Sequence, residues 1–133
     1  MYNKYEDTTS RQITWYRTVL RNCFWKYTGN KIVVGETTLD TNTTICRVPA
    51  NTAFLERYLW NDAQDKSKYF TLGTGDIIIK GEVADEINEY ASGFRSSDIL
   101  TKYKKRGECM VIEQCVVSAG FGRDLEHYYV KGV

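Results

Sequence analysis

The chain has 133 residues, a length typical of one domain with one hydrophobic core. Hydrophobic residues make up 42% of the sequence and charged residues 26%, which excludes a wholly disordered chain. The net charge is only +1, whereas most nucleic-acid-binding proteins have a strong basic excess that attracts phosphate, so the charge argues against that class. Ten Tyr residues and a single Pro make the composition favour β-structure.

No apolar run approaches the roughly 20 residues that a membrane-spanning helix needs. The polar first ten residues, which include Glu6 and Asp7, are unlike a secretory signal, so we expect a protein made in a cytosol. Four cysteines without a CxxC pair are typical of reduced, buried thiols: Cys23, Cys46, Cys109 and Cys115. One histidine and no paired ligand spacing predict no metal site, and no motif predicts a cofactor.

Residues 1–12 are predicted to form a flexible N-terminal arm. They are mostly polar, with aromatic side chains at Tyr2 and Tyr5, and a chain end of this composition is usually loose unless a partner orders it. Residues 13–133 are predicted to form a single β-rich domain, because no linker or repeat divides them.

Residues that favour strands fill nearly every position from 13 to 27. The sequence Thr28-Gly29-Asn30 offers a turn, and a further apolar run, 32–34, ends at Gly35. We expect two or three antiparallel strands here. Both of their faces carry apolar residues, so we expect cover on both sides, from a second sheet or from a neighbouring subunit.

The next elements are shorter. A strand over 43–48 is closed by Pro49, which has no N–H for a ladder. Apolar residues within 51–60 have helical spacing and predict one or two helical turns, and the polar stretch 61–68 predicts a surface loop. A turn at Gly73-Thr74-Gly75-Asp76 then leads into a β-branched strand over 77–83.

Residues 84–107 are predicted to form an inserted loop followed by the one clear helix. Ser96 or Ser97 is the expected N-cap, and Gly107 is the expected end. The last helical turn is basic, at Lys102, Lys104, Lys105 and Arg106. These cations either contact phosphate, favour the helix dipole and solubility, or pair with the acidic run Glu82–Glu89 of a neighbouring copy.

A strand over 109–117 has Met110, Ile112, Gln114 and Val116 on one predicted face, and a last strand covers 128–131 after a glycine-rich loop. Roughly seven or eight short strands and one helix favour a mainly β fold. We predict a small antiparallel β-barrel or sandwich with an inserted loop and one short α-helix.

Catalytic patterns are weak. His127 is the only imidazole, at the start of a predicted strand, and no nucleophile elbow is present. The acidic cluster is typical of a solvated face: Glu82, Asp85, Glu86 and Glu89. We therefore expect no enzyme activity, and the alternative is a small hydrolase that uses His127 as its base.

Three segments carry a resemblance to a known family. They are the aromatic opening from Trp15 to Trp25, the turn and strand from Gly75 to Gly81, and the ending from His127 to Gly132. In this order and spacing the chain resembles the head-completion proteins of tailed bacteriophages, also called head-closure, stopper or neck proteins. Tail-terminator proteins are the close alternative.

The resemblance implies a virion structural protein at the head–tail interface, made in the bacterial host cytoplasm and without a membrane partner. It implies a small β-barrel that assembles into a ring of roughly six or twelve copies. The implied partners are the portal or adaptor, the tail proteins and the packaged DNA that passes through the lumen. A small nucleic-acid-binding β-barrel is the alternative from another class.

By this resemblance the inserted loop lines the lumen, with candidate residues Asp85, Glu86, Glu89 and Arg95. Acidic side chains at that place repel DNA phosphates and let the DNA slide. The candidate residues for subunit or partner contacts are Tyr2, Tyr5, Lys102, Lys104, Lys105 and Arg106.

Overall fold

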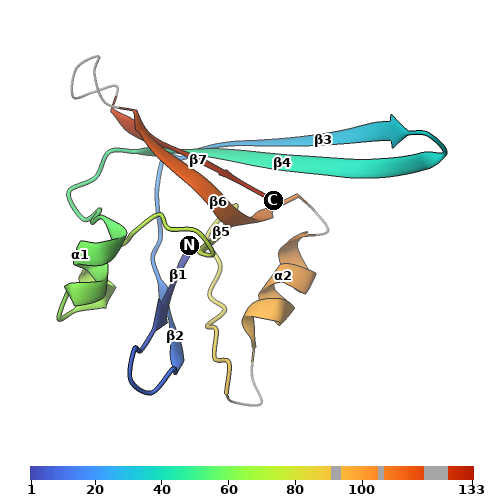
Figure 1. The fold of residues 1–133 in the computed structure, drawn as a ribbon. Coiled ribbons are helices and arrows are strands. Elements are labelled where there is room, and N and C mark those ends of the chain that lie inside the picture. Colours follow the sequence, from blue (N-terminus) through green and yellow to red (C-terminus); the bar gives the residue numbers. More distant parts are fainter. Residues whose placement is uncertain (91–93, 105–106, 119–125) are drawn as a thin grey trace.

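The computed structural model describes residues 1–90, 94–104, 107–118 and 126–133, apart from the side chains of residues 30, 32, 39–41 and 118. Its strands are β1 (Tyr2–Glu6), β2 (Ile13–Arg17), β3 (Phe24–Val34), β4 (Thr37–Pro49), β5 (Ile77–Ile79), β6 (Cys109–Ser118) and β7 (His127–Gly132). Its helices are α1 (Arg57–Asp62) and α2 (Ser96–Lys104), with a 3₁₀ turn at Lys66–Lys68. Figure 1 shows their arrangement.

The strands follow one antiparallel order, β2-β1-β5-β6-β7-β4-β3, which leaves β2 and β3 as open edges. The strand directions turn between β1–β2 and β3–β4, so that the two parts of the sheet enclose a core (Figure 1). The prediction of a mainly β, antiparallel fold is confirmed, and its form is sandwich-like rather than a closed barrel.

Two apolar clusters fill the interior. The larger lies between the two parts of the sheet and includes Ile78, Met110 and Val130. The smaller includes Ile77 and Ile79, and α2 covers it. Successive strand residues point to opposite faces, and β5 is buried on both, so its three isoleucines supply both clusters.

The prediction of a flexible arm at residues 1–12 is wrong. Residues 2–6 form β1, between β2 and β5, and Tyr2 is only 1% exposed. A tight turn closes the β1–β2 hairpin, in which the Asp7 carboxylate accepts the backbone N–H groups of Thr9 (2.9 Å) and Ser10 (2.6 Å). The polar sequence that begins at Asp7 thus forms a turn rather than a loose end.

The predicted turn at residues 28–30 is also wrong, because β3 runs through it. The chain reverses instead at Gly35, whose φ of 61° lies in the left-handed region. β3 and β4 pair without a break from Phe24–Arg47 to Val34–Thr37, whereas β7 accompanies β4 only as far as Thr44. Residues 29–42 therefore leave the body as a two-stranded ribbon, here called the hairpin arm (Figure 1).

The predicted loop over 61–68 instead contains the end of α1 and the 3₁₀ turn Lys66–Lys68, whereas other elements match in type and differ in length. The helix expected within 51–60 is α1, and the strand expected over 77–83 ends at Ile79. The helix α2 starts at Ser96, so Ser96 is its first residue and not its N-cap. The residue at the cap position is Arg95. The Asp98 carboxylate accepts the backbone N–H of Arg95 at 2.8 Å and closes this end.

A bulge changes the predicted face of β6. The pairing with β7 shifts register between Ile112 and Gln114, so that Cys115 pairs with Val130 on the core side. Met110 and Ile112 are buried as predicted, but Val116 is 46% exposed. The glycine-rich loop at 120–124 lies outside the described residues.

Candidate functional site

One face of the sheet made by β3, β4, β7 and β6 is covered by the core, and the opposite face is open. Cys46, Val48 and Val130 point inward and are at most 2% exposed. Their strand neighbours point outward. The outer sheet face is named here for the residues at its centre: Phe24, Lys26, Ile45, Arg47, Gln114, Val116, Tyr129 and Lys131.

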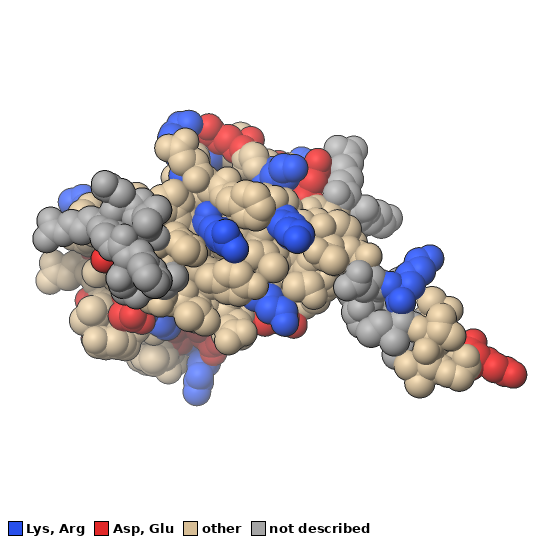
Figure 2. Space-filling view, turned by 90° about the horizontal axis from the view of Figure 1, so that it is seen from above, with Lys and Arg blue, Asp and Glu red and all other residues tan. Residues whose placement is uncertain are grey.

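Aromatic and cationic side chains alternate on the outer sheet face. Phe24 is 54% exposed, and the Arg47 guanidinium lies 5.7 Å from the centre of its ring. Lys26, Arg47 and Lys131 are its cations, and its acid neighbour is Glu113, which is exposed at the bulge in β6 beside Gln114. Figure 2 views this side and shows Lys and Arg on the face, with Asp and Glu toward its margins.

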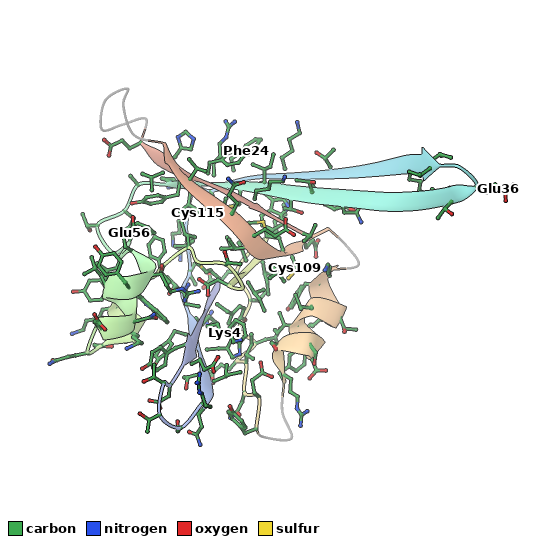
Figure 3. All side chains as sticks on the ribbon, viewed as in Figure 1. Lys4, Phe24, Glu36, Glu56, Cys109 and Cys115 are labelled. Atoms are coloured by element: carbon green, nitrogen blue, oxygen red, sulfur yellow. The ribbon has the colours of Figure 1, made fainter. Side chains whose placement is uncertain are left out.

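No described helix or strand covers this face (Figure 1). Figure 3 shows Phe24 on the side of the sheet away from both helices. The prediction that the first strands are covered on both sides is thus met on one side only within the described part of the chain. An exposed apolar patch with a charged surround is typical of an interaction surface.

The hairpin arm is the second exposed apolar feature. Val33 is 69% exposed and Val34 is 60% exposed, next to the turn that carries Glu36 at the far end (Figure 3). From Thr43 to Thr37, β3 is the one described strand that pairs with β4, and β3 itself is an edge strand along its whole length. The arm therefore offers unpaired backbone groups on both of its edges.

Two of the predicted lumen residues have partners within the chain. The Asp85 carboxylate accepts a hydrogen bond from Tyr103 (2.6 Å) and pairs with the Lys102 ammonium (2.9 Å), and these contacts lower the pKa of Asp85. The Glu89 carboxylate accepts the indole N–H of Trp15 at 2.8 Å. Ile87 between them is buried. This part of the loop is thus packed against β2 and α2, which gives its acids a structural role.

The other two predicted lumen residues, Glu86 and Arg95, are exposed. Their role at a lumen stays a prediction. The basic helix end is only partly described: Lys102 pairs with Asp85, Lys104 is exposed, and Lys105 and Arg106 lie outside the described residues. Contact between the acidic run and this basic turn of neighbouring copies is one of the three alternatives given above, and within one chain the two already meet through this pair.

The two tyrosines expected on a mobile arm are held in the fold. Tyr2 lies in the core, and its hydroxyl donates to the backbone carbonyl of Asp85 at 2.5 Å, so it is not available as a surface contact. Tyr5 lies between the Trp60 ring, 6.2 Å away, and the Lys66 ammonium, 4.3 Å from the ring centre. Both residues anchor β1 to its neighbours.

A buried polar cluster that the sequence did not reveal joins β1, α1 and the turn before β5. The Asp76 carboxylate is fully buried and accepts four hydrogen bonds at 2.8–2.9 Å, from the Arg57 guanidinium, the Asn3 amide and the backbone N–H groups of Lys4 and Gly73. Burial raises the pKa of Asp76, while Arg57 and the backbone donors oppose this rise. All four partners are donors, so the carboxylate form fits the site.

A pocket of about 360 Å³ lies beside the N-terminus. Cys23 and Cys46 line it, as does the Met1 ammonium, which donates to the Thr18 carbonyl at 3.0 Å. Burial lowers the pKa of that amine to about 6. A hydrogen bond between the two thiols lowers the pKa of Cys23 and raises that of Cys46. Sequence spacing gave no signal for this pocket, because it depends on the position of β1.

The described residues contain no group of three or more His, Cys, Asp or Glu side chains placed to hold a metal ion. All four cysteines are free, with Cys46 and Cys109 buried. His127 begins β7, where the sequence placed it at a strand start. No helix in the described part of the chain is long and apolar enough to cross a membrane.

The fold and these surfaces define a small, open β-protein with an uncovered sheet face and a projecting hairpin. The chain belongs to the family described as "Family of unknown function (DUF6751)", which matches residues 1–133. Comparison with curated proteins and with solved structures found no match for it.

Proposed function

We propose that this chain is an assembly protein of the tailed-phage head–tail connector. In this role it forms a ring below the portal or adaptor that seals or gates the DNA channel and docks the tail. The observation that carries the proposal is the apolar surface that the chain leaves open at two separate places, the outer sheet face and the hairpin arm. A tail terminator has the same requirements and is the close alternative.

Ring assembly explains why both surfaces are open. Subunits of a ring meet head to tail, so each copy needs two different complementary surfaces. The hairpin arm projects on one side of the body, whereas the outer sheet face lies over its centre (Figures 1 and 2). The resemblance to head-completion proteins supplies the biological setting.

Binding of single-stranded nucleic acid is a second candidate, favoured by the outer sheet face itself. Exposed Phe24 and half-buried Tyr129 provide rings for base stacking, and three cations lie beside them. Proteins that bind single strands combine these features. Oligonucleotide binding that weakens steeply with salt and is lost in Phe24→Ala supports this candidate.

Immunogold labelling of phage particles tests the connector directly. Particles of a phage whose genome encodes this chain are labelled with an antibody to it and imaged by electron microscopy. The proposal expects label at the junction of head and tail. Label confined to the tail tube end of free tails points to the terminator, and particles without label overturn the virion role. Detergent-free, gradient-purified particles serve as the sample, with particles of an unrelated phage as the control.

A further inference from the structure

We infer that the hairpin arm of one copy docks on the outer sheet face of the next copy of this chain. The inference rests on the proposed assembly function and names the two surfaces that meet. It commits to a second copy as the occupant, because the chain itself carries both halves of the contact.

The arm needs a surface to cover it. It is a two-stranded ribbon without a third strand, and such a ribbon is at best marginally stable in water. Val33 and Val34 are more than half exposed near its tip. Because neighbouring strand residues point to opposite faces, docking one face of the ribbon on apolar surface removes one of these two side chains from water and stabilises the ribbon.

The outer sheet face is complementary to this tip in apolar surface and in charge. Phe24 and Val116 offer exposed apolar surface of the same kind. The face carries three cations at its centre, whereas the turn at the tip of the arm carries the acid Glu36. Opposite charges at the margin of an apolar contact favour one orientation over others.

The same copy cannot supply this contact. β3 pairs with β4 over all of its 11 residues, so the arm continues the strands of the sheet and points away from the body (Figure 1). A tip at the end of this ribbon does not reach the face at its base. The contact is therefore between copies, and since its two surfaces differ, it repeats from copy to copy into a ring or a filament.

Sedimentation velocity over a concentration series tests this contact. The arm variant is Val33→Asp/Val34→Asp, the face variant is Phe24→Asp/Val116→Asp, and the control is Tyr58→Asp, which changes an equally exposed side chain on α1. We expect self-association to be at least tenfold weaker in the arm and face variants than in the wild-type chain. In the control variant we expect it to be unchanged. Circular dichroism with a thermal melt identifies a variant that fails to fold. A variant of that kind is replaced by Val34→Ser or Phe24→Ser.

Mixing the two variants gives the decisive result. The arm variant retains an intact face, and the face variant retains an intact arm, so the mixture forms a heterodimer that grows no further. Wild-type assembly that survives in both variants overturns this contact but leaves the connector function in place. A wild-type chain that stays monomeric, with oligonucleotide binding lost only in the face variant, overturns both and supports nucleic-acid binding.

Discussion

At the residue scale, a single buried carboxylate holds three segments that are distant in sequence. Asp76 ends the turn before β5, Arg57 belongs to α1, and Asn3 belongs to β1. Arg57 also donates to the Lys4 carbonyl at 2.9 Å, so the guanidinium closes the cluster from the solvent side. A charge buried in this way is stabilising only while all of its partners are present.

Asp76→Asn therefore lowers stability. The amide retains the shape of the carboxylate, but its NH₂ group faces donors, and Arg57 loses its counter-charge. We expect the free energy of unfolding to fall by about 3 kcal/mol. Urea denaturation followed by tryptophan fluorescence measures it, with the exposed Asp62→Asn as the control. Equal stability of the two variants contradicts the role given to Asp76.

The Met1 amine makes stability depend on pH. Its pKa falls from 8.0 in the unfolded chain to about 6 in the fold, because the ammonium form is buried. Between these values the unfolded chain binds more protons, so stability rises as the pH increases from 6 to 8. The cost of burying the cation is fully present below pH 6, at most about 3 kcal/mol.

Denaturation at several pH values measures this slope in a chain that begins at Met1. The same chain with an acetylated amine is the control, since its N–H still donates to Thr18 but no longer titrates. The account expects the difference between the two chains to shrink from pH 6 to pH 8. A constant difference shows that the amine is not buried as a cation.

At the element scale, β7 approaches β6 so closely that only glycine fits at position 132. Val111 and Val133 exchange two backbone hydrogen bonds, of 2.8 and 3.2 Å, and a methyl group on Gly132 overlaps the Val111 carbonyl. Gly132→Ala forces β7 away from the bulge in β6. We expect a loss of about 1–3 kcal/mol.

A thermal melt compares this variant with Gly29→Ala, where the added methyl makes only ordinary contacts at 3.5 Å. The account predicts a clearly lower Tm for Gly132→Ala than for Gly29→Ala. A Tm for Gly132→Ala equal to that of the wild-type chain contradicts the tight approach of these strands.

The local sequence predicted most elements but not their lengths. Strand-forming runs and the cap-to-glycine pattern of α2 were sufficient to identify β3, β5, β7 and that helix. The turn was placed at 28–30 instead of Gly35 because the local signal of Thr28-Gly29-Asn30 is strong, while the continuous pairing with β4 depends on distant residues. The bulge in β6 is equally non-local, since it follows from the register of β7.

The candidate site was less predictable than the fold. Acidic and basic clusters were visible in the sequence, but the contact by which the fold joins Asp85 of one to Lys102 of the other was not. The outer sheet face was not visible, because register and burial decide which half of an alternating strand faces solvent. A strand sequence with apolar residues on both faces, such as 13–27, indicates that both faces need cover. It does not indicate whether the same chain or a neighbouring subunit provides that cover.

At the scale of the whole molecule, the open face and the projecting arm are parts of one continuous ladder. The core occupies one side of that ladder, and the described chain provides nothing for the other side. An unsupported longest hairpin in a chain of this size is the feature that the proposed contact between copies explains.

The native mass of the purified protein over a concentration series, with negative-stain images of any large species, tests the account most directly. The account predicts association that increases with concentration and closed rings with a central hole. A single monomeric species at every concentration, unchanged when the arm and the outer sheet face are mutated, contradicts it.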